Sequence, residues 1–208
     1  MAEIRPVKLT RFRDGDNLTP ARAFYTRPLG AAFDTVFGWF WATLQPPKKK
    51  CAMSTDPPDE AEITEFIAQT CAGMDIQRID GDCFYIYDPE RKFEGVQRIP
   101  FATLITRNDY DTVSDLDRPG IFRLNIGVGK ETYLRLLGTP PARPGASGII
   151  EGNYDFTALD TILPHPIYGF MNWICVLNPS RATFEMLKPM LSEAHALAAK
   201  RNGTKHAG

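Results

Sequence analysis

Four short segments of this chain alternate their side chains with a period of two residues, which is typical of β-strands whose two faces differ. Residues 121–127 read IFRLNIG, where apolar side chains alternate with Arg123 and Asn125. The same division appears in residues 83–88 (CFYIYD), 101–106 (FATLIT) and 173–178 (WICVLN). We therefore expect a sheet with one aliphatic face and one mixed face.

The mixed face is the predicted ligand site, because aromatic walls with a few placed polar groups are typical of small-molecule sites. We predict that it binds a small polar or anionic ligand while it stays open to solvent. The predicted ligand-binding residues are Tyr85, Tyr87, Thr103, Arg123, Asn125, Lys130, Tyr168 and Trp173. In the alternative interpretation, the loop of residues 139–168 covers this face, and Arg123 bonds to backbone carbonyls or to an acid such as Asp160.

Helices are expected at both ends of this strand-rich region. Residues 60–71 are amphipathic, and residues 180–202 form a closing helix with Ser180 as N-cap. Its predicted buried stripe is Phe184, Leu187, Leu191, Ala194 and Ala198. The pair Asp80-Gly81 between two strand-like runs predicts a β-hairpin. The predicted fold class is α+β, a two-layer sandwich with an antiparallel sheet of about four to five strands and helices on one face.

The first residues of the chain differ from the rest in charge. Residues 1–50 hold nine basic and four acidic residues, a net charge of +5, which leaves −6 for the remainder because the whole chain carries −1. We predict a basic and aromatic extension over residues 1–57 that is disordered or reflects a choice of start codon, a single α+β domain over 58–203 and a tail over 204–208. Residues 29–44 are apolar but shorter than the ~20 residues of a spanning helix. A membrane-surface anchor is the alternative for this segment.

Several kinds of chemistry lack the residues that they need. The GVGKET run of residues 127–132 lacks the first glycine and the Ser or Thr of a phosphate loop. The Asp-rich residues 106–120 lack the glycine and glutamate of a calcium loop, and we expect a solvated loop or short helix there. The four cysteines have no metal-type spacing, and no secretory signal is recognisable. We predict reduced thiols, a cytoplasmic location, no metal and no cofactor.

Two other functions remain open at this point. His165, which lies between Pro164 and Pro166, is the candidate catalytic residue, because a histidine whose pKa lies near neutrality can act as a general base. A protein-interaction module is the other alternative. In that case a second subunit would cover the aromatic face and form a homodimer.

The order of DLDRPGIFRLNIGVGKETYLRLLG, YDFTALDTILPHPIY and NWICVLNPS resembles a family of small microbial proteins catalogued as a domain of unknown function, over roughly residues 61–202. More distantly, the chain is similar to MmcQ/YjbR-like proteins. Both resemblances imply a compact α+β domain, and neither implies catalytic residues. The second implies DNA binding, but phosphate contacts need Lys and Arg, and the region after residue 50 is net acidic. We therefore do not expect a nucleic-acid partner.

Overall fold

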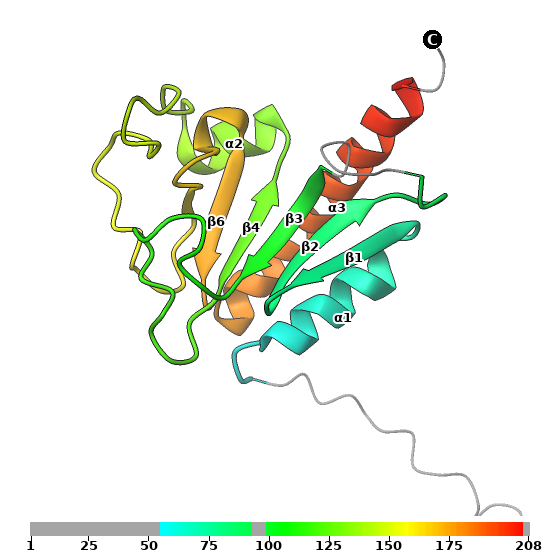
Figure 1. Cartoon of the computed structure of the whole chain (residues 1–208), viewed down its shortest axis with the longest axis horizontal. Coiled ribbons are helices and arrows are strands. Elements are labelled where there is room, and N and C mark those ends of the chain that lie inside the picture. The colour runs from blue at the N-terminus through cyan, green and yellow to red at the C-terminus, as the bar shows by residue number, and fades with distance from the viewer. Residues whose placement is uncertain (1–54, 93–98, 206–208) are drawn as a thin grey trace, which may run out of the picture. The chain divides into compact units, whose positions relative to one another are not determined.

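The computed structural model of the chain describes residues 55–92 and 99–205 (Figure 1). Residues 1–54 of the predicted extension and 206–208 of the predicted tail lie outside these ranges. The elements in chain order are α1 (Glu60–Thr70), β1 (Met74–Ile79), β2 (Asp82–Tyr87), β3 (Pro100–Ile105), β4 (Arg123–Gly127), α2 (Lys130–Leu137), β5 (Leu163–Pro164), the 3-10 helix η2 (Gly169–Met171), β6 (Trp173–Leu177) and α3 (Arg181–Lys205).

The strands form one antiparallel six-stranded sheet in the order β1-β2-β3-β4-β6-β5. The predicted α+β class is confirmed, and the sheet is slightly larger than expected. One strand absent from the prediction is β5, where Leu163 pairs with Cys175 and Pro164 with Ile174. A proline has no backbone N–H to donate to a neighbouring strand, but it is tolerated in an edge strand such as β5.

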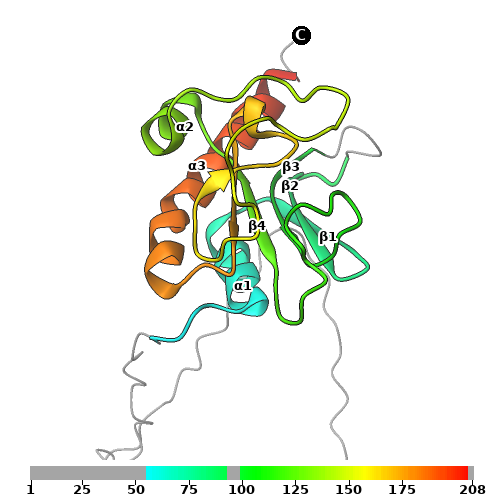
Figure 2. The ribbon, with the colours of Figure 1, turned by 90° about the vertical axis from the view of Figure 1, so that its left-hand side faces the viewer.

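The helices α1 and α3 pack on the same side of the sheet, and long loops lie on the other side (Figure 2). The predicted stripe of α3 is buried in full, and it meets Leu104, Leu124 and Val176 in the main hydrophobic core. The side chain of Ser180 accepts from the backbone N–H of Thr183 at 3.2 Å, which confirms the predicted cap. Burial of the aliphatic face therefore holds the two layers together.

The predicted hairpin is confirmed at Asp80 and Gly81. Ile79 pairs with Asp82, so these two residues form the whole connection between β1 and β2. Both have a positive φ, 50° at Asp80 and 102° at Gly81. Two-residue hairpin loops need this conformation because it matches the twist of the strands, and Asp-Gly accepts it readily.

The predicted faces of β2 are wrong. Tyr85 pairs with Ala102, and the ladder continues from Ala102 through Ile126 to Ile174, so Tyr85 points into the main core. Its hydroxyl lies 2.8 Å from Oγ1 of Thr64 on α1. Tyr87 packs against the same core. Both parities of CFYIY are apolar or aromatic, so only the register of pairing decides which side chains are buried by the helices.

A register shift between Tyr85 and Ile86 changes the neighbouring strand as well. Tyr85 pairs with Ala102, but Ile86 pairs with Pro100, which leaves Phe101 as an extra residue in β3. Phe101 and Ala102 both belong to the main core as a result. A strict period of two along FATLIT does not hold across such a bulge.

The position of Tyr85 is tested by Tyr85→Phe. We expect the free energy of unfolding to fall by about 1 kcal/mol, because the variant lacks the buried hydroxyl and its hydrogen bond to Thr64. Thr64 keeps its hydrogen bond to the carbonyl of Glu60. Tyr110→Phe is the matched control, since that ring is 48% exposed, and it should change stability by less than about 0.5 kcal/mol. Equal urea midpoints for wild type and Tyr85→Phe would place the Tyr85 hydroxyl outside the core.

Candidate functional site

A cavity of about 550 Å³ lies on the mixed face of the sheet. Its floor is formed by Thr103 of β3 and by Arg123 and Asn125 of β4. The remaining lining residues are Phe84, Ile99, Pro100, Ile105, Tyr110, His165, Ile167, Tyr168, Met171 and Trp173. The cavity is therefore apolar and aromatic in its walls and polar in its floor.

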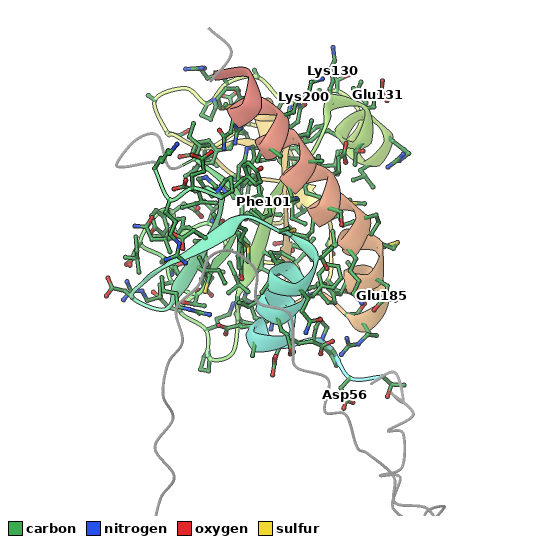
Figure 3. The ribbon with its side chains drawn as sticks, turned by 90° about the vertical axis from the view of Figure 1, so that its right-hand side faces the viewer. Asp56, Phe101, Lys130, Glu131, Glu185 and Lys200 are labelled. Atoms are coloured by element: carbon green, nitrogen blue, oxygen red, sulfur yellow. The ribbon has the colours of Figure 1, made fainter. Side chains whose placement is uncertain are left out.

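The lining includes most of the residues that the sequence predicts for the site: Thr103, Arg123, Asn125, His165, Tyr168 and Trp173. Tyr85 and Tyr87 do not belong to it, because they face the helices, and Phe84 takes their place. Lys130 is also absent from the lining. It is exposed at the start of α2 (Figure 3). The preceding Gly129 lies against Glu193 of α3.

The mixed face is covered rather than open. Arg123 and Asn125 are each only 1% exposed, and Thr103 is buried as well. The chain between β3 and β4 and the segment around β5 and η2 lie over this face (Figure 2). The first supplies Tyr110 to the lining, and the second supplies His165, Ile167, Tyr168 and Met171. The expectation of an open face is therefore wrong. These loops cover the face and leave only the cavity over β3 and β4.

Arg123 is held by a buried ion pair with Asp111. Its Nη1 donates to Oδ1 of Asp111 at 3.1 Å and its Nη2 to Oδ2 at 2.7 Å, and Nη1 also donates to Oγ of Ser114 at 2.7 Å. Both charged side chains are 1% exposed. Such a fork-like pair neutralises the guanidinium and fixes its plane.

The acid that pairs with Arg123 is therefore Asp111, and the suggested partner Asp160 is wrong. Oδ1 of Asp160 instead accepts from the backbone N–H of Ser180 at 2.6 Å. Residues 106–120 form an irregular loop as expected, but Asp111, Ser114 and Leu116 within it are buried. Four acids at similar spacing look alike in the sequence, so only the loop's path over the sheet distinguishes Asp111.

Two polar atoms on the floor have no hydrogen-bond partner among the described residues: Nε of Arg123 and Oδ1 of Asn125. The Asn125 amide donates through Nδ2 to Oγ1 of Thr103 at 2.9 Å. Rotating the amide would pair Oδ1 with the Thr103 hydroxyl and leave Nδ2 without a partner. One end of the amide is thus unpaired in either orientation. Buried polar groups normally find partners, so such atoms call for an explanation.

His165 is a buried neutral histidine with its Nδ1 already occupied. Nδ1 accepts from the backbone N–H groups of Ile167 at 3.0 Å and Tyr168 at 3.2 Å. Burial, and then the positive charge of Arg123, hold the pKa of His165 well below its usual range. A neutral imidazole that accepts at Nδ1 carries its proton on Nε2. The group can therefore donate a hydrogen bond, whereas a general base needs a free lone pair.

Aromatic rings surround His165 and form the rim of the cavity. Ring centroids lie 5.1 Å away for Tyr168 and 6.2 Å away for Trp173. Gly127 lies opposite Trp173 in the ladder, and a Cβ at this glycine would come within 3.0 Å of the indole. The glycine therefore leaves room for the Trp173 ring over β4. Tyr168 and Met171 are 47% and 56% exposed and mark the mouth of the cavity.

Other chemistries find little support in the described ranges. No group of three or more His, Cys, Asp or Glu residues there could hold a metal ion. The described thiols, Cys71, Cys83 and Cys175, are buried, and burial raises the pKa of Cys175 to about 12. A thiol with such a pKa is a poor nucleophile at neutral pH. Within residues 55–92 and 99–205, no helix has the length and apolar character that a bilayer crossing needs.

Fold and site together define an α+β protein with an aromatic-walled cavity on one face of its sheet. The chain belongs to a family of unknown function, DUF6194, which matches residues 58–207. This confirms the resemblance to a domain of unknown function, whereas the comparisons bring no support for similarity to MmcQ/YjbR-like proteins. No curated protein and no solved structure matches the chain.

A double-mutant cycle tests the buried ion pair. Asp111→Leu and Arg123→Met should each cost about 3–5 kcal/mol of unfolding free energy, because each leaves one charge buried without its partner. The double variant should be more stable than either single variant. The measurement is urea unfolding of all four proteins. Additive losses in the double variant would mean that the two side chains do not interact.

The state of His165 is tested through the pH dependence of stability. The folded-state pKa lies below the unfolded value of about 6.5, so the unfolded chain binds an extra proton as the pH falls. Stability should therefore be full above about pH 6.5 and decline below it, with a slope of up to about 1.4 kcal/mol per pH unit. In His165→Asn, whose Oδ1 can still accept from the loop amides, this part of the slope should vanish. Identical slopes from pH 7.5 to 5.0 would contradict a neutral His165.

Proposed function

We propose that the cavity on the mixed face binds a small uncharged organic molecule that has an apolar body and a polar edge. The observation that carries this proposal is the pair of unpartnered polar atoms, Arg123 Nε and Asn125 Oδ1, beneath aromatic walls. A protein that used this face for stability alone would gain by replacing such atoms with apolar groups. Retaining them is expected where a ligand supplies the missing partners.

The size of the cavity supports a small-molecule ligand. Its volume of about 550 Å³ falls within the roughly 300–1,000 Å³ that is usual for pockets of this kind. Tyr168 and Met171 are exposed lining residues, so a molecule that enters the cavity would pass them. Large flat partners would reach only the rim.

The charges at the site favour an uncharged ligand over the anionic one that the sequence also allows. Asp111 already neutralises Arg123, and His165 is held neutral. Lys130, the other basic residue of the predicted site, is absent from the lining. An anion in this cavity would be buried without a compensating charge, which is costly.

Catalysis by His165 as a general base is less well supported than binding. Its Nδ1 lone pair faces two backbone N–H groups, and its Nε2 carries the proton. A proton from a substrate would therefore have no free acceptor on this ring. The geometry supports a role for His165 as a donor to a bound molecule.

Other predictions stand without a specific observation in their favour. A DNA-binding role of the YjbR type is disfavoured by the acidic balance of the region after residue 50. A homodimer over the mouth at Tyr168 and Met171, and a cytoplasmic location, stay predictions.

Asn125→Leu separates binding from stability. We expect this variant to change the melting temperature little, because the loss of the hydrogen bond to Thr103 offsets the removal of a buried atom without a partner, and to lose affinity for ligands of the cavity. Binding is followed by methyl NMR of Ile105 and Ile167 during a screen of neutral aromatic compounds, and by native mass spectrometry of the full chain as purified. Lys130→Ala is the control and should behave as wild type. Unchanged binding together with a fall in melting temperature would mark Asn125 as structural and contradict the proposal.

A further inference from the structure

We infer that the ligand of this cavity is a flat ring that carries both an N–H donor and a carbonyl acceptor, as in a lactam. This inference rests on the proposed function and names the chemical class of its ligand. It follows from the pattern of donors and acceptors that the protein leaves unpaired around the cavity.

The unpaired groups on the floor are of opposite kinds. Arg123 Nε offers an N–H donor. With the Asn125 amide oriented so that Nδ2 donates to Thr103, Asn125 Oδ1 offers an acceptor. The two residues stand two positions apart on β4, and so their side chains emerge on the same face about 6.6 Å apart along the strand. A ligand that satisfies both must present an acceptor to Arg123 and a donor to Asn125.

A further donor lines the cavity from another element. His165 follows β5, and its neutral imidazole carries a proton on Nε2, because Nδ1 accepts from Ile167 and Tyr168. Thr103 adds a hydroxyl beside Asn125. Donors thus outnumber free acceptors, which favours a ligand with a carbonyl oxygen, since such an oxygen can accept two hydrogen bonds.

The remaining wall favours a planar ligand body. Phe84, Tyr110, Tyr168 and Trp173 all line the cavity. Aromatic side chains contact flat rings through offset or edge-to-face packing, in addition to the burial of apolar area. The charged residue among the lining, Arg123, is already paired, so the recognition of the polar edge relies on neutral hydrogen bonds.

Three probes of similar size test this pattern. 2-Quinolone carries the N–H and the carbonyl, 1-methyl-2-quinolone lacks the N–H, and 2-naphthoate is an anion. Dissociation constants are measured on the full chain by NMR titration of the methyl groups of Ile105 and Ile167. We expect 2-quinolone to bind wild type about tenfold or more tightly than either other probe, because loss of the donor leaves Asn125 Oδ1 buried without a partner.

Asn125→Leu turns the comparison into a cycle. If the ligand N–H donates to Asn125, the dissociation constants of 1-methyl-2-quinolone and 2-quinolone should become nearly equal in this variant. A purely steric effect of the methyl group would leave their ratio unchanged. Lys130→Ala should leave all three constants unchanged, since Lys130 is not in the lining.

The outcomes separate this inference from the proposed function. Equal affinities of the two quinolones for wild type, a ratio that survives in Asn125→Leu, or tightest binding of 2-naphthoate would each overturn the lactam-type ligand. In the first two cases the cavity would still bind a neutral molecule. Failure of wild type to bind any probe would also overturn the inference, while the screen of neutral compounds decides the proposed function separately.

Discussion

The buried ion pair between Arg123 and Asp111 is the interaction on which the arrangement of the mixed face depends. It joins β4 to the irregular loop of residues 106–120. Nη1 of Arg123 also donates to Oγ of Ser114 in the same loop. Replacing a buried ion pair by well-packed apolar side chains is often neutral or stabilising, so we interpret this pair chiefly as a positioning contact. With the loop held there, Tyr110 lines the cavity and Arg123 Nε is left without a partner.

The two faces of the sheet have different tasks. The face towards α1 and α3 buries Leu104, Leu124 and Val176 and supplies the driving force for folding. The other face contains two of the four buried side-chain atoms that have no partner among the described residues, Arg123 Nε and Asn125 Oδ1. A chain can tolerate such local cost only when the rest of its core is well packed, and departures of this kind concentrate at functional sites.

Much of the architecture follows from local signals. The hairpin at Asp80-Gly81, the cap at Ser180 and the stripe from Phe184 to Ala198 depend on neighbours close in the sequence, and the structure confirms each of them. The faces of β2 depend on pairing with a distant strand, and there the alternation of CFYIY is ambiguous. Only the register between β2 and β3 shows that Phe84, and not Tyr85, faces the cavity. Likewise, Asp111 carries no local mark that separates it from the other acids of its loop.

The sequence by itself determined the class of fold, the strands β3, β4 and β6, and the presence of Arg123, Asn125 and Trp173 on one face, because the period of two is a property of each strand alone. Tertiary structure decided which strand residues were paired, which acid met Arg123 and which loop closed over the face. It also decided the protonation of His165, since burial and the contacts of Nδ1 arise only after the loop has folded. Those features come from contacts between segments far apart in the chain, and no local pattern encodes them.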